Sequence, residues 1–192
     1  MTARFLTALL TALCLACWPA PPALAAGNQV VRIDPVLRGG MLELDADVDL
    51  ALNAQLREAA ERGVPLYFTA DLVITTSRWW WFDRTVVETQ MTRRVVYNAL
   101  TRQWRVGTGE LSLPVASLAE AMNVVSHIRG WRVLEAGALD HGTLYEGQLR
   151  LRLDTSQLAR PFQVNALNSS SWSLATPWAD FSFAVAESED DS

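Results

Sequence analysis

The sequence predicts an α+β fold that is mostly antiparallel β, arranged as a meander or a β-sandwich, with two short helices. Three observations predict it: apolar and polar residues alternate in several segments, short links join consecutive segments, and two helical patterns carry capping signals. Alternation with a period of two is typical of half-buried strands, and short links favour antiparallel neighbours. We therefore expect one β-rich domain over residues 26–186.

The strands are predicted from this alternation. In residues 42–48, Leu42 and Leu44 share one face, while Glu43, Asp45 and Asp47 share the other. A long strand is predicted over 66–76, and strands over 85–100 and 103–107 follow it to complete an antiparallel meander. Residues 144–154 alternate again, and residues 181–185 fit a last short strand. The stretch 155–178 is rich in Ser, Asn and Pro and is expected to be irregular, with a surface loop around residues 161–171.

The first helix is expected to begin after Asp49, which is a suitable N-cap, and to run to about Arg62. Leu52 and Leu56 then fall on one face. Gly63 stands where a glycine commonly ends a helix, and the proline at position 65 prevents continuation.

The second helix is predicted from a capping box, in which Ser117 and Glu120 satisfy free N–H groups at the helix start. It is expected to run to about Ile128 and to be closed by Gly130. His127 then lies in or beside the last turn, where a structural interaction with the helix dipole is expected.

The first 25 residues have the parts of a secretory signal. Arg4 supplies a positive start, residues 5–17 are apolar and uncharged, and Ala23-Leu24-Ala25 fits a cleavage site. The apolar run is shorter than the roughly 20 residues that span a bilayer. We expect cleavage near Ala25/Ala26 and export to the periplasm, with an uncleaved anchor as the alternative. Cleavage would remove both cysteines of the chain, and with them any thiol nucleophile or disulfide.

The charge pattern excludes a typical nucleic-acid-binding protein. All 16 basic residues are arginines, and the formal net charge is −5. Loss of Arg4 with the signal makes this −6, and four acids lie in the tail 187–192, which leaves the body near −2. Such a body attracts neither nucleic acid nor an anionic membrane. The tail is expected to be disordered and solvated.

The segment RWWWFD, residues 78–83, is the candidate partner surface. Extending the alternation of the preceding strand turns Trp80 and Phe82 inward and Trp79 and Trp81 outward. The candidate surface residues are Arg78, Trp79, Trp81, Asp83 and Arg84. Aromatic anchors beside arginine are typical of protein interfaces. Two alternatives stay open: peripheral membrane contact, and burial in the core beneath a helix or the C-terminal segment that carries Trp172 and Trp178.

No catalytic, cofactor or metal residue is predicted. Glu43, Asp45 and Asp47 lie roughly 6.5–7 Å apart along a strand, too far apart to converge on one ion without help from loops. We expect instead a solvated acidic face or cross-strand pairs, with Arg150/Arg152 and Arg93/Arg94 as the candidate partners. His141, beside Asp140 in a turn pattern, is the remaining candidate for a catalytic base.

Four segments in order, GVPLYFTADLVI, RWWWFDR, YNALTRQWRV and RLDTSQLARPFQVNAL, resemble a proteobacterial exported family that is catalogued as a domain of unknown function. Its members are often labelled proline-rich signal peptide proteins. The resemblance implies a periplasmic protein and carries no catalytic residue with it. Genes of the family stand beside a membrane sensor histidine kinase, which implies a signalling accessory.

Three function hypotheses follow. The first is an exported, non-enzymatic binding or accessory protein that docks on an envelope protein. The second is a carrier of an apolar ligand, such as a lipid, held between sheet and helices. The third is a hydrolase that uses His141 with a serine.

Overall fold

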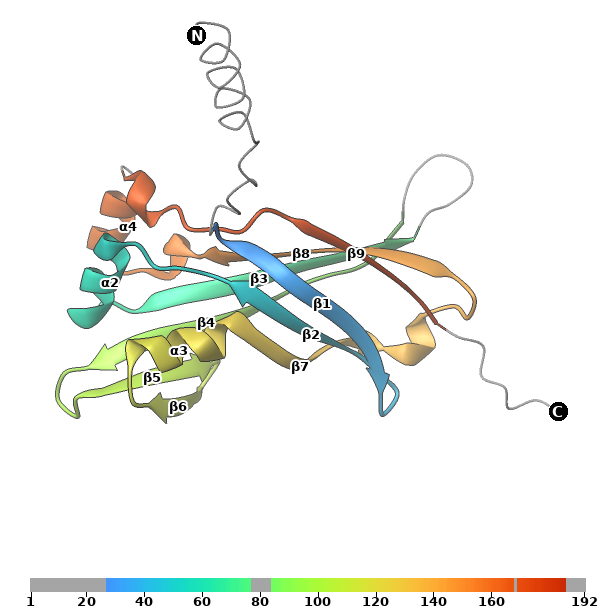
Figure 1. The fold of residues 1–192 in the computed structure, drawn as a ribbon, viewed down its shortest axis with the longest axis horizontal. Helices are drawn as coiled ribbons and strands as arrows, with labels where there is room; N and C mark the ends of the chain where they lie inside the picture. Colours follow the sequence, from blue (N-terminus) through green and yellow to red (C-terminus); the bar gives the residue numbers. More distant parts are fainter. Residues whose placement is uncertain (1–26, 77–83, 168, 186–192) are drawn as a thin grey trace, which may run out of the picture.

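A computed structural model describes residues 27–76, 84–167 and 169–185. The described strands form two antiparallel sheets, one with the order β1-β2-β7 and one with the order β6-β5-β4-β3-β8-β9. Figure 1 shows the smaller sheet lying obliquely across one face of the larger one. The prediction of a mostly antiparallel β fold with short helices is therefore confirmed.

The bounds of the elements are as follows. The smaller sheet contains β1 (Gln29–Arg38), β2 (Met41–Asp49) and β7 (His127–Glu135). The larger sheet contains β3 (Leu66–Thr76), β4 (Arg84–Asn98), β5 (Gln103–Thr108), β6 (Leu111–Val115), β8 (Leu144–Leu153) and β9 (Ala179–Ala184). The helices among the described residues are α2 (Ala54–Glu61), α3 (Leu118–Ser126) and α4 (Arg160–Leu167). Single turns of 3-10 helix are η1 (Ala136–Ala138), η2 (Thr155–Gln157) and η3 (Ser170–Trp172).

The core lies between the two sheets. The alternation of β2 turns Leu42 and Leu44 inward, and both are essentially inaccessible. On the facing sheet, β3 contributes Leu72 and β8 contributes Leu149, which are also fully buried. The predicted meander is confirmed, since β3, β4 and β5 are consecutive antiparallel neighbours.

Helix α2 starts later than predicted. Asp49 is the last residue of β2, and the N-cap is Asn53, whose side chain accepts a hydrogen bond from the Leu56 N–H at 2.9 Å. The register of β2 with β1 holds Asp49 opposite Gln29, which makes it part of the strand. The end of the helix is as predicted, because Gly63 has a φ of +87° and its N–H donates to the Ala60 carbonyl.

Helix α3 ends two residues earlier than predicted. Its start is confirmed: Ser117 accepts from the Glu120 N–H, and the Glu120 carboxylate accepts from the Ala116 N–H at 2.8 Å. His127 is the C-cap and begins β7 directly, so Ile128 is a buried strand residue. Gly130 does not close the helix; it lies inside β7 with a φ of +59°.

Three strands and one helix lie where none was predicted: β1, β6, β7 and α4. The expected surface loop at 161–171 is therefore wrong, because α4 and η3 occupy it. In Figure 1, α2 and α4 lie at the same end of the sandwich. Trp172 of η3 is buried at this end, beside Val64 and Phe162. The described residues contain no helix that is long and apolar enough to cross a membrane.

Candidate functional site

The outer face of the larger sheet carries the most developed polar site. Because side chains alternate along β3, Asp71, Val73 and Thr75 point away from the core. Register places Arg150 and Gln148 of β8 on one side of this row and Gln90 and Glu88 of β4 on the other. The side chains therefore meet at the centre of the sheet, on the face opposite the smaller sheet.

Asp71 holds two arginines on one carboxylate. The Nε atoms of Arg150 and Arg152 both donate to Oδ2 of Asp71 at 2.8 Å, and Nη2 of Arg152 lies 3.3 Å from Oδ1. The Asp71 side chain is only 16% exposed, so these charge-assisted bonds are partly shielded from water. The hydrogen bond to Asp71 raises the pKa of Arg152 above its ordinary value, against the opposing effect of burial.

Asp154 extends this cluster to the end of β8. It lies 3.5 Å from Nη1 of Arg152 and caps η2 by accepting from Ser156 and Gln157. Burial raises the pKa of the Asp154 carboxyl, but hydrogen bonds from Ser156 and Gln157 and the charge of Arg152 outweigh it, so the pKa lies below its usual range. Asp154 thereby links Arg152, and with it the Asp71 cluster, to the start of η2.

Trp178 lies over this cluster. The Cζ atom of Arg150 is 4.4 Å from the centroid of the indole, a cation–π contact, and Trp178 remains 39% exposed. The preceding segment runs beside β8, because the Leu151 N–H donates to Oγ1 of Thr176 and the Thr176 N–H donates to the Leu151 carbonyl. This pairing sets Trp178 on the outer face of the sheet.

Two adjoining grooves run along this face and share Val73. The first has a volume of about 690 Å³ and is bordered by Asp71, Glu88, Gln90, Arg150, Arg152 and Trp178. The second has a volume of about 570 Å³ and is bordered by Thr75, Glu146, Gln148, Asp180 and Ser182. Together they form the "outer groove". It is bordered by four carboxylates and two guanidinium groups, so its charge is negative.

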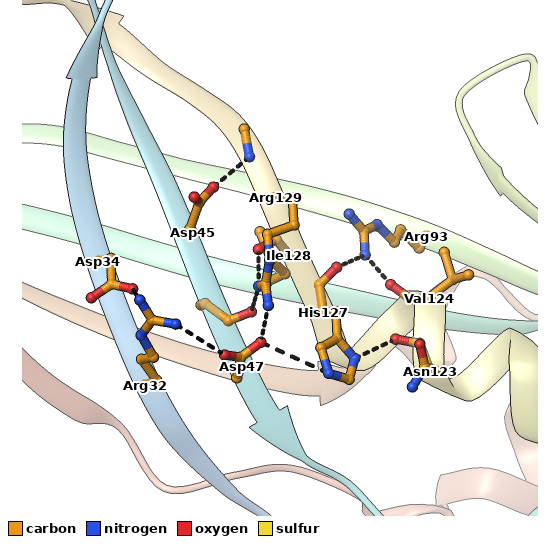
Figure 2. Close-up of polar contacts among 12 residues, drawn as sticks. Arg32, Asp34, Asp45, Asp47, Arg93, Asn123, Val124, His127, Ile128 and Arg129 are labelled. Carbon is orange, nitrogen blue, oxygen red and sulfur yellow. Dashed lines mark hydrogen bonds and ion pairs between the residues drawn. The ribbon is translucent and has the colours of Figure 1, made fainter.

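The acidic row of β2 forms a second polar cluster, on the outer face of the smaller sheet. Figure 2 shows Arg32 and Arg129 converging on Asp47. Arg38 lies 3.4 Å from Glu43 and 3.3 Å from Asp45. The predicted pairs with Arg150/Arg152 and Arg93/Arg94 are therefore wrong. The reason is that β2 belongs to a different sheet from β4 and β8, and its neighbours β1 and β7 supply the arginines.

Asp45 has a further role in this cluster. It accepts a hydrogen bond at 2.6 Å from the N–H of Gly130, at a point where the register between β2 and β7 shifts. This bond is the main reason that the pKa of Asp45 lies below its ordinary value; burial opposes the shift, and Arg38 and Arg129 add to it. The carboxylates of this row are thus engaged by arginines of β1 and β7 and by a backbone N–H at the register shift.

The two histidines lie apart from the outer groove. His127 caps α3, where Nδ1–H donates to the Asn123 carbonyl at 2.8 Å and Nε2 lies 3.9 Å from Asp47 (Figure 2). This is the predicted structural position at the helix end. His141 is exposed in a turn, and within the described part of the chain its ring forms no hydrogen bond or ion pair. The neighbouring Asp140 uses its backbone N–H to donate to the Tyr145 hydroxyl.

The predicted partner surface falls mostly outside the described residues. Arg78, Trp79, Trp81 and Asp83 belong to the range 77–83, which is not described, and Arg84 is the exposed first residue of β4. The surface stays a prediction. Of the two tryptophans expected to cover that side, Trp172 is core and Trp178 covers the outer face. Sequence reasoning missed the Asp71 cluster, although two arginines at alternate positions of one strand indicate an acid on the strand beside them.

Comparison with known families finds a match over most of the chain. The family model described as "Domain of unknown function (DUF4390)" matches residues 25–182, and the chain belongs to this family. Comparison with curated proteins and with solved structures finds no match.

Proposed function

We propose that this member of the DUF4390 family is an exported, non-enzymatic binding protein, and that its outer groove docks a basic segment of an envelope protein. The observation that carries the proposal is the stack of Trp178, Arg150 and Asp71. Tryptophan and arginine supply much of the binding energy at protein interfaces. Here both are held in place before a partner arrives, which reduces the entropy lost on binding.

The groove favours binding over bond-breaking chemistry. Among the residues that the structure describes, its border contains neither histidine nor cysteine, and the Asp71 carboxylate is already engaged by two arginines. Glu88, Glu146 and Asp180 are carboxylates for which the described residues supply no arginine partner. A partner segment with arginine or lysine side chains would complement them. The signal-like N-terminus supports a periplasmic location for this partner.

In-cell photo-crosslinking tests the proposal. A photoreactive residue in place of Gln148 lies on the groove, and one in place of Arg57, exposed on α2, serves as the matched control. We expect one envelope protein to be captured from position 148 and not from position 57. The purified partner should then bind the wild-type chain at least tenfold more tightly than Trp178→Ala. Equal capture from both positions, or equal binding by Trp178→Ala, would refute the proposal.

A further inference from the structure

At β6, part of the apolar core face of the larger sheet is exposed to solvent. Register sets Leu113 opposite Val106 and Leu111 opposite Thr108. Leu111 and Leu113 therefore share a face with the buried Val115 and Val106, yet they are 81% and 59% exposed. A groove of about 440 Å³ lies beside them, bordered by Arg93, Val106, Thr108, Leu111, Leu113 and Val124, and we name it the "edge groove".

Arg93 places a positive charge in this apolar setting. It pairs with Phe68 across β3 and β4, which puts it on the core face. Figure 2 shows its Nη1 donating to the carbonyls of Val124 and His127, the latter at 3.1 Å, so it caps the C-terminal end of α3. Burial lowers the pKa of its guanidinium, which nevertheless stays charged at neutral pH.

Arg93 differs from the arginines of the two polar clusters. Arg32, Arg38, Arg129, Arg132, Arg150 and Arg152 each lie within ion-pair distance of a carboxylate. Within residues 27–76, 84–167 and 169–185, the side chain of Arg93 donates hydrogen bonds to backbone carbonyls only and has no carboxylate partner. A partly buried cation without an anion is costly, and an incoming anion would offset that cost.

We propose that the edge groove binds a long-chain fatty carboxylate. The alkyl chain lies along Leu111, Leu113 and Val124, and the carboxylate accepts hydrogen bonds from the guanidinium N–H groups of Arg93 that α3 does not use. The volume falls within the range of about 300–1,000 Å³ that is common for small-molecule sites. Addition of a partner strand to β6 is less favourable, because Pro114 gives this edge a residue without an N–H. This site is independent of the outer groove.

The test uses a fluorescent long-chain acid, cis-parinaric acid, and its uncharged methyl ester, with purified and delipidated protein. The acid should bind saturably with one site, and the ester, which has the same chain, should bind about tenfold more weakly. Absence of saturable binding of the acid, or equal binding of acid and ester, would overturn the proposal.

Variants locate the site. Leu111→Ser with Leu113→Ser should weaken binding of the acid by about tenfold, because both side chains are exposed in the free protein and become buried on binding. Leu100→Ser is the matched control: Leu100 is 95% exposed at the turn between β4 and β5, and its loss should leave binding unchanged. An equal loss in both proteins would show non-specific binding and reject the site.

The role of Arg93 is tested by Arg93→Met. This variant should bind the acid and the ester equally, because the charge that distinguishes them is gone. A retained preference for the acid would reject Arg93 as the anion-binding group. Arg93 also caps α3, so the variant is first checked by circular dichroism. If it does not fold, Arg93→Lys replaces it: this variant keeps a cation but loses the planar fork, so the preference for the acid should fall, and an unchanged preference would reject Arg93 as the anion-binding group.

Discussion

Trp178 covers the guanidinium of Arg150, with 4.4 Å between Cζ and the ring centroid, while Arg150 donates to Asp71 at 2.8 Å. An exposed aromatic ring thus lies over a paired charge at the middle of a sheet. The contact itself is weak, because Trp178 is partly in water. The contribution of Trp178 to folding stability and its contribution to partner binding can therefore be measured separately.

Trp178→Ala should leave the fold almost intact. We expect a loss of about 1 kcal/mol or less in the free energy of unfolding, which is typical of an exposed cation–π contact. Trp172→Ala is the control at a buried tryptophan, 5% exposed, where the loss should be about 3–5 kcal/mol. Urea denaturation of both variants measures the difference. Similar losses at the two positions would show that Trp178 is part of the core.

Asp71→Asn should destabilise the larger sheet. The substitution leaves Arg150 and Arg152 side by side without their shared anion, and we expect a loss of about 1–2 kcal/mol, discounted because both arginines are partly exposed. Asp180→Asn is the control on the same face, where the exposed carboxylate accepts, among the described residues, from Gln148 only, and the loss should stay below about 0.5 kcal/mol. Chemical denaturation measures the loss in both variants, and equal losses would contradict the expected difference between Asp71 and Asp180.

Stability should decrease below about pH 4 through Asp45 and Asp154. Both have a folded-state pKa below the ordinary value of 3.8, so their contributions are present above that value and lost as pH falls through the folded pKa. Asp45→Asn should be less stable than the wild type at pH 6. The difference in the free energy of unfolding between the two proteins should become smaller when unfolding is measured at pH 3 and below. A difference that does not change with pH would show that the pKa of Asp45 is the same in the folded and unfolded states.

Gly147→Ala should destabilise the pairing of β8 with β9. A Cβ at this position would lie 2.2 Å from Cζ of Phe181, so the ring must shift, at a cost of roughly 1–3 kcal/mol. Gly137→Ala is the matched control, since a Cβ there meets no atom within 4 Å and its φ is not positive. Thermal unfolding should show a lower Tm for Gly147→Ala and a Tm for Gly137→Ala that is unchanged or slightly higher. A reversed order would mean that Phe181 does not cover Gly147.

His141→Ala should leave the cellular role of the protein unchanged. The imidazole is exposed, and the described residues give it neither a serine to activate nor a carboxylate to orient it. Growth or signalling phenotypes of the chromosomal variant, compared with the deletion strain, provide the measurement. A phenotype equal to that of the deletion would revive the hydrolase hypothesis.

Strands with clean alternation could be predicted from the sequence, the edge strand β9 among them, and strands with a broken pattern could not. The strand β2 follows its apolar pattern because Leu42, Leu44 and their successors all face one core. Its neighbour β1 contains Pro35 and an irregular step near Arg32, so its period is broken. The strand β7 could not be recognised in the sequence because Ile128 continues the helical period of α3. The chain passes from helix to strand at His127 without a linker.

The candidate site was less predictable than the fold, because it depends on which strands are neighbours. Arg150 and Arg152 are obvious as an alternating pair, but only the register of β3 with β8 identifies Asp71 as their acid. The position of Trp178 depends on Thr176, which pairs with Leu151 outside any strand pattern. Charge complementarity between segments far apart in the chain is not encoded in local periodicity.

The order of strands in the smaller sheet has a consequence for folding kinetics. The hairpin of β1 and β2 forms from adjacent residues, but its third strand begins at His127, more than 70 residues later in the chain. Until β7 pairs with it, one edge of β2 has no hydrogen-bonded neighbour, and closing so long a loop is slow. We expect the three-stranded sheet to be completed late in folding, with Gly130 and Asp45 joining only then.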